Sequence, residues 1–169
     1  MRIDKIATKG DEVYIEYSEQ TPAGPNVFTL DCNQRGLPEL YHKLNQLSDH
    51  VIELMELPDD YTDELQVRTV NFKYVEVKKG GEIMGAIITS VKKLKSGHSV
   101  VLNTPFATEL PMGGGTNYTG CLSEVCVNVL RGLEIEAQKY INGERVQMEL
   151  FKKETAKEKR ERIKSEKAA

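Results

Sequence analysis

The spacing of apolar residues alternates between the strand period and the helix period, and this pattern constrains the fold more than any other feature of the chain. Around residues 37–55 and 122–141, apolar residues recur every three or four positions, which predicts two amphipathic helices. Short alternating runs predict strands around residues 3–6, 13–17, 27–30, 66–77, 83–91 and 100–103. Runs of strands interrupted by single helices indicate an α+β fold, with an antiparallel sheet of about six strands, two main helices on one face and the order βββαβββα.

Proline and glycine mark the expected ends of the helices. Pro38 fits a first helical turn, Pro58 lies just past the first helix, and Gly143 is a candidate C-cap of the second. We therefore expect a single domain over residues 1–143. A candidate partner-binding peptide at 144–151 and a charged, basic tail of helix-forming composition at 152–169 would follow it.

The net charge of −3 combines two opposite parts. Residues 152–169 hold eight basic and four acidic residues, which leaves 15 basic and 22 acidic residues, a charge of −7, for residues 1–151. An acidic body argues against a domain that coats itself in nucleic acid. Local contacts with nucleic acid remain open, and the candidate residues are Lys92, Lys93, Lys95, Lys159, Arg160 and Arg162. The alternative is a solvated turn around Lys92 and a solvated tail.

Cysteine content and hydropathy bear on location and cofactors. The chain has three cysteines and no Cys-x-x-Cys motif, so neither a disulfide framework nor a zinc site is signalled, and Cys126 fits a helix core. There is no apolar run of the ~18 residues that a membrane span needs, and no apolar signal core follows Met1. We expect a cytoplasmic protein that binds no membrane, metal or cofactor.

Few residues form a pattern suited to catalysis. Asp59, Asp60, Asp63 and Glu64 could serve a metal-dependent nuclease, but a contiguous run after a helix also fits a solvated loop. No nucleophile, base and orienting group occur in a recognisable arrangement, so we do not expect an enzyme. A ligand site at a sheet rim is another candidate, with Asn103, Thr104 and Tyr118 as its residues. Such a rim would suit an anti-defence module that sequesters a nucleotide-type small molecule or a host protein. The alternative is that these polar residues only terminate the strand.

The segment Gln147-Met148-Glu149-Leu150-Phe151 carries the most specific signal in the chain. It resembles the pentapeptide with which bacterial DNA polymerases, mismatch-repair proteins and other replication factors bind the sliding clamp, with Met148 where Leu is commoner. The resemblance implies Leu150 and Phe151 as adjacent apolar anchors, with Met148 as a lesser anchor. It assigns Gln147 as the hydrogen-bonding residue that sets the register.

Met148 and Leu150 also alternate as a strand would, so a last strand packed on the body is an equal alternative. Beyond the peptide, the chain is similar in general character to small proteins of bacteriophage and prophage early regions, which often lie among replication and recombination genes. The leading hypothesis is a non-enzymatic accessory or modulator of replication or recombination that docks on the host clamp. The basic tail would then contact DNA, and a homo-oligomer would be one way to cover a sheet edge.

Overall fold

The structure is a computed structural model that describes residues 1–58, 61, 65–77, 80–110 and 121–146. The strands are β1 (Arg2–Lys9), β2 (Glu12–Thr21), β3 (Gly24–Cys32), β4 (Leu65–Glu76), β5 (Glu82–Lys93), β6 (Ser99–Asn103) and β7 (Ala107–Thr108). The helices are α1 (Pro38–Leu54) and α2 (Glu124–Ile141). The predicted α+β class, with an antiparallel sheet and two helices, is confirmed, and β7 is an addition to the expected order.

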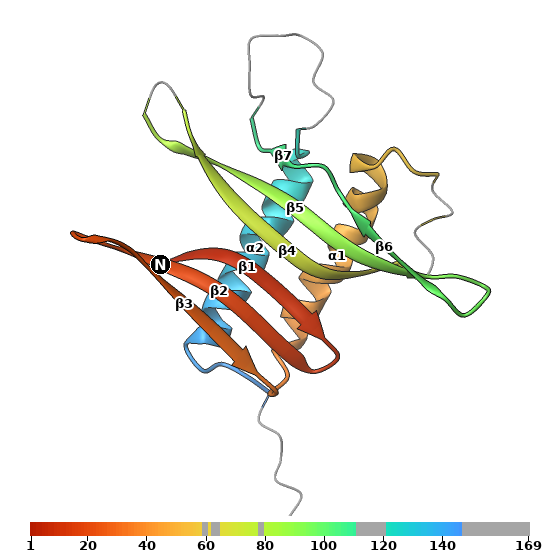
Figure 1. Ribbon diagram of the computed structural model, residues 1–169, viewed down its shortest axis with the longest axis horizontal. Coiled ribbons are helices and arrows are strands. Elements are labelled where there is room, and N and C mark those ends of the chain that lie inside the picture. Colours follow the sequence, from red (N-terminus) through yellow and green to blue (C-terminus); the bar gives the residue numbers. More distant parts are fainter. Residues whose placement is uncertain (59–60, 62–64, 78–79, 111–120, 147–169) are drawn as a thin grey trace, which may run out of the picture.

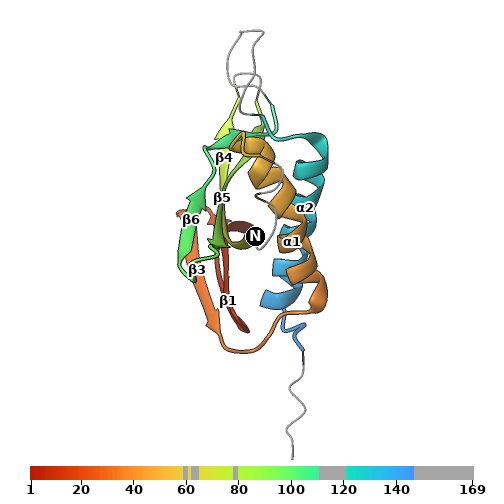
Figure 2. The same ribbon diagram turned by 90° about the vertical axis from the view of Figure 1, so that its right-hand side faces the viewer.

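All strand pairs in the sheet are antiparallel, and the strand order is β3-β2-β1-β4-β5-β6, with β7 also paired to β5 (Figure 1). Both helices cover the same face of the sheet, and none of the described residues forms a helix on the other face (Figure 2). None of the helices in the described part of the chain is long and apolar enough to cross a membrane.

A row of β-branched side chains in register builds the centre of the core. Ile6 of β1 pairs with Ile15 of β2 and with Val70 of β4, and Val70 pairs in turn with Ile88 of β5. All four are fully buried. Leucines from both helices belong to the same core, among them Leu44, Leu47, Leu130 and Leu133. Each such side chain stabilises the fold by about 1.5–3 kcal/mol through burial.

The expected helix ends are found, for local reasons. Helix α1 begins at Pro38, whose missing N–H is unneeded in a first turn. The hydroxyl group of Ser123 accepts a hydrogen bond from the backbone N–H of Cys126 at the start of α2. Gly143 follows α2 with φ of +94°, the left-handed conformation that glycine adopts readily.

The first three strands are longer than the runs that predicted them, and one further strand was not predicted. β3 spans nine residues rather than four, because β2 and β3 pair without interruption as far as Thr21 and Gly24. The short strand β7 lies between the last predicted strand and the second predicted helix, where no strand was predicted. Two residues are too few to show a period, and β7 forms because β5 offers it an edge.

Candidate partner-docking site after helix α2

Residues 144–146, which immediately precede the clamp-like peptide, are fixed to the body. After Gly143, the backbone N–H of Glu144 donates to the carbonyl oxygen of Lys139 at 3.0 Å. Arg145 forms an antiparallel bridge with Gly36, and the N–H of Val146 donates to the carbonyl oxygen of Arg35 at 3.1 Å. The segment is therefore paired with the loop that leads from β3 into α1.

The side chain of Arg145 holds this segment in place. Its Nε donates to the carbonyl oxygen of Tyr140 at 3.2 Å, and its Nη1 donates to Oε1 of Gln34 at 3.1 Å. The guanidinium carbon lies 4.6 Å from the centre of the Tyr140 ring, within range of a cation–π contact. Nη1 also lies 3.2 Å from Sγ of Cys32. Arg145 thus joins α2, the end of β3 and the loop after it.

Tyr140 belongs to the same group of contacting residues, the Arg145 cluster, together with Cys32 and Gln34. Its side chain is almost fully buried, and its hydroxyl group donates to the carbonyl oxygen of Gln34. Burial raises the pKa of Tyr140, and its hydrogen bond with Cys32 raises it further. The pKa of the Cys32 thiol is lowered, first by a hydrogen bond from the Gln34 backbone, then by Tyr140 and by the charge of Arg145. The cluster therefore makes the Cys32 thiol easier to deprotonate than an ordinary cysteine.

The clamp-like residues themselves, Gln147, Met148, Leu150 and Phe151, lie outside the described residues, so the geometry is known only as far as Val146. The same holds for Tyr118 of the candidate rim, for Lys159, Arg160 and Arg162 of the tail, and for the carboxylates Asp59, Asp60, Asp63 and Glu64. Among the residues that are described, no group of three or more His, Cys, Asp or Glu side chains could hold a metal ion.

The two described residues of the candidate rim are already engaged with the sheet. The hydroxyl group of Thr104 accepts a hydrogen bond from the backbone N–H of Ile88 at 3.0 Å, and only 4% of Thr104 is exposed. Oδ1 of Asn103 accepts from the hydroxyl group of Thr89 at 2.7 Å. The Thr104 contact continues the β5–β6 pairing one residue beyond β6. A ligand at Thr104 would have to replace a buried backbone contact.

A strand and a turn share the basic strip, which consists of the candidate nucleic-acid contacts Lys92, Lys93 and Lys95. Lys92 and Lys93 end β5, where successive side chains point to opposite faces, so the two do not share a surface patch. Nζ of Lys92 donates to the carbonyl oxygen of Tyr61 at 2.9 Å and lies 4.8 Å from the centre of its ring. Lys95 lies in the turn between β5 and β6. The strip therefore offers no continuous basic surface.

The chain matches no known family model, and no curated protein or solved structure is significantly similar to it.

Sequence reasoning missed the Arg145 cluster. Its members come from β3, from the loop before α1 and from the segment after α2, and no motif links Cys32 or Gln34 to Arg145. The signal in the sequence was weak, because it consisted only of Arg145, two residues after Gly143, the glycine that follows α2.

Proposed function

We propose that this protein is a non-enzymatic accessory of DNA replication or recombination. It acts in the cytoplasm and docks on the bacterial DNA sliding clamp through Gln147, Met148, Leu150 and Phe151. The observation that supports the proposal most is the anchored segment just before the peptide. Arg145 and Val146 are hydrogen-bonded to the body, so a partner bound to the next five residues would be held close to the domain.

The chemistry of the peptide also supports this proposal. Adjacent Leu and Phe anchors with a register-setting glutamine are the chemistry of a short recognition peptide, for which a micromolar Kd corresponds to about −8 kcal/mol.

The experiment measures binding of the full-length chain to purified sliding clamp, by surface plasmon resonance. Two anchors at about 1–2 kcal/mol each predict that the double substitution Leu150→Ala and Phe151→Ala weakens binding about a hundredfold. The matched control is Val125→Ala with Ile135→Ala, which shortens two apolar side chains of α2 that are 65% and 54% exposed. Binding by the control should equal that of the parent chain.

Three results would overturn the proposal: no clamp binding by the parent chain, equal binding by the double variant, or equal loss in the control. The melting temperature of each variant is measured in parallel. A fall of several degrees in the double variant alone would assign Leu150 and Phe151 to the fold instead of to a partner site.

A further inference from the structure

A second site lies at the end of the sheet near the start of α1, where β1 and β4 stop pairing. The two strands pair only from Lys5 to Ala7, and Ala7 lies opposite Thr69. The register of β4 then shifts between Val67 and Thr69, an irregularity of the kind that redirects side chains. Beyond the last pair, a hollow of about 250 Å³ opens between the β1–β2 turn, α1 and β4.

The polar groups around this hollow are suited to donating hydrogen bonds to an anion. They are the guanidinium groups of Arg35 and Arg68, the amides of Asn45 and Gln66, and the hydroxyl groups of Thr8 and Tyr41. No Asp or Glu is among the described residues that line it. The apolar walls, formed in part by the buried side chains of Leu44 and Val67, keep these groups at one surface.

Several of these donors lack a strong partner within the described chain. Arg68 donates to Oε1 of Gln66 at 2.7 Å, a neutral acceptor, and no described carboxylate lies within 4.0 Å of its guanidinium group. Arg35 lies 3.5 Å from Oδ1 of Asp11, but the two side chains are 57% and 59% exposed, and such pairs contribute only about 0–1 kcal/mol. A ligand could therefore bind both arginines at a small cost in free energy.

Charge and shape together define the class of ligand. The planar guanidinium group matches the spacing of phosphate oxygens and donates to two of them at once. Residues 1–151 carry a net charge of −7, which disfavours a long polyanion and leaves a compact anion as the better match. A volume of about 250 Å³ accommodates a phosphate group with a small substituent.

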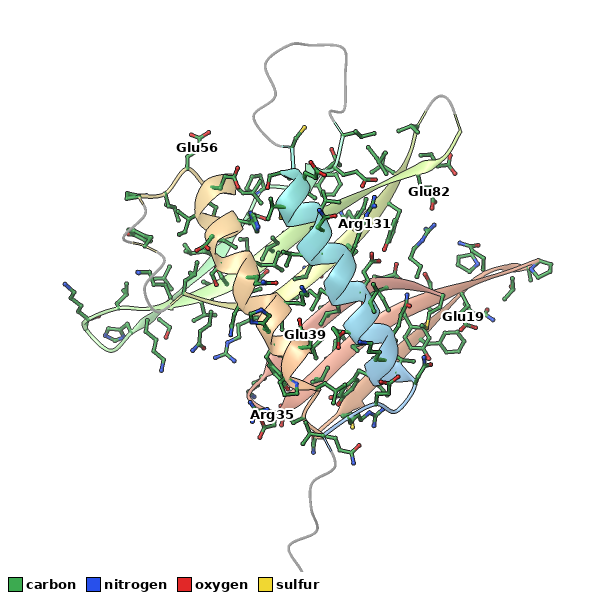
Figure 3. All side chains as sticks on the ribbon, turned by 180° about the vertical axis from the view of Figure 1, so that it is seen from behind. Glu19, Arg35, Glu39, Glu56, Glu82 and Arg131 are labelled. Atoms are coloured by element: carbon green, nitrogen blue, oxygen red, sulfur yellow. The ribbon has the colours of Figure 1, made fainter. Side chains whose placement is uncertain are left out.

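We propose that this hollow binds the phosphate group of a small phosphorylated molecule, with Arg68 and Arg35 as the charged contacts and Asn45 and Thr8 as neutral donors. Figure 3 shows Arg35 at the end of the molecule where the chain enters α1, and Arg131 further along α2 toward the opposite end. The proposal does not depend on the proposed function, because none of the described residues that line the hollow belongs to the clamp-like peptide.

The test follows the melting temperature and the Kd of the full-length chain with three probes: inorganic phosphate, adenosine monophosphate and adenosine. Sodium chloride at equal ionic strength is the salt control. A ligand that binds only the folded state raises the melting temperature. Phosphate and adenosine monophosphate should do so, whereas adenosine and chloride should not. Equal effects of chloride and phosphate would overturn the proposal.

Variants locate the site. Arg68→Gln should weaken adenosine monophosphate binding at least tenfold while leaving the circular dichroism spectrum unchanged. Arg131→Gln is the matched control, because Arg131 is an exposed arginine that pairs with Glu109 at 2.7 Å, away from the hollow, and it should bind like the parent chain. Equal binding by Arg68→Gln, or equal loss in both variants, would refute the assignment.

A further arm distinguishes a small ligand from a nucleic-acid backbone. The probe is a single-stranded oligonucleotide without a terminal phosphate. The proposal expects it to compete poorly with adenosine monophosphate. Tighter binding of the oligonucleotide that is lost in Arg68→Gln would assign the hollow to DNA and overturn the proposal of a small phosphorylated ligand.

Discussion

The hydroxyl group of Tyr74 on β4 donates a hydrogen bond to Oε1 of Glu134 on α2, and so ties the sheet to the helix layer at a point where β1 and β4 no longer pair. The same hydroxyl lies 3.4 Å from the carbonyl oxygen of Ile3 on β1. The guanidinium carbon of Arg2 lies 4.5 Å from the centre of the Tyr74 ring. Tyr74 therefore connects three elements across the opening between two strands.

Replacing Tyr74 with Phe should lower the free energy of unfolding by about 1–2 kcal/mol, because the half-buried Glu134 carboxylate then loses its hydrogen-bond donor. Urea denaturation measures this change. Tyr61→Phe is the control, because Lys92 contacts the ring and the carbonyl oxygen of Tyr61, and phenylalanine keeps both. Equal stability of Tyr74→Phe and the parent chain would show that the hydrogen bond contributes nothing.

Glu134 should also make stability depend on pH. Burial raises the pKa of its carboxyl group above the ordinary value of 4.5, and this outweighs the lowering by Tyr74 and Arg131. Between the unfolded and folded pKa values, the folded state holds a proton that the unfolded state has lost, so this contribution to stability is present at low pH and disappears as pH rises through the folded pKa. Glu134→Gln keeps an acceptor for Tyr74 and removes the titration.

We therefore expect the stability of Glu134→Gln, relative to the parent chain, to increase as pH rises from 4.5 toward 7. Urea denaturation across that range measures the difference. A constant difference at all pH values would mean that the pKa of Glu134 is the same in the folded and unfolded states.

The sequence predicted the elements whose signals are local and missed the features that depend on distant neighbours. The leucine stripe of α1 and the alternation around Ile15 each predict that one face of the element is buried. In the structure these faces are buried. The length of β3 depends on β2, and β7 depends on the edge of β5, so neither has a signal of its own. The Arg145 cluster and the hollow beside Arg68 need tertiary contacts that no local spacing encodes.

Gly85 of β5 is required by a close contact. A Cβ atom at this position would lie 2.5 Å from two ring carbons of Phe106 and 2.9 Å from a methyl group of Thr108. Gly85→Ala should therefore destabilise the protein by about 1–3 kcal/mol, measured by urea denaturation. The cost should shrink in a Phe106→Ala background, and an unchanged cost there would place the strain elsewhere.

Gly132→Ala on α2 is the matched control for Gly85. Its nearest neighbour would be the flexible end of Lys43 at 3.0 Å, which can move aside. Alanine is the better helix former by about 1 kcal/mol, so this substitution should be neutral or stabilising.

Thr104 should prove structural, because its hydroxyl group is the acceptor for the buried N–H of Ile88. Thr104→Val keeps the shape and removes that acceptor, so we expect a loss of about 1–3 kcal/mol in urea denaturation. Thr104→Ser retains the hydroxyl group and should cost less. If the two substitutions lower the free energy of unfolding equally, the hydrogen bond between Thr104 and Ile88 does not contribute to stability.

The cysteines should react with iodoacetamide at very different rates in the folded protein, since the thiolate is the reactive form. The pKa of Cys32 is lowered by the Gln34 backbone, Tyr140 and Arg145, whereas burial and the charge of Glu53 raise the pKa of Cys126 to about 12. Mass spectrometry at pH 8 should find Cys32 alkylated before Cys126. Unfolding in urea should remove the difference.

Arg145→Gln tests the part of this reactivity that comes from the anchor. It removes a positive charge 3.2 Å from Sγ of Cys32, so the pKa of Cys32 should rise and its alkylation should slow several-fold. The Gln34 backbone contact is the largest cause of the lowered pKa, so Cys32 should still react faster than Cys126. An unchanged rate in Arg145→Gln would mean that Arg145 does not rest against Cys32 in solution, and the anchor before residue 147 would then be looser than these contacts indicate.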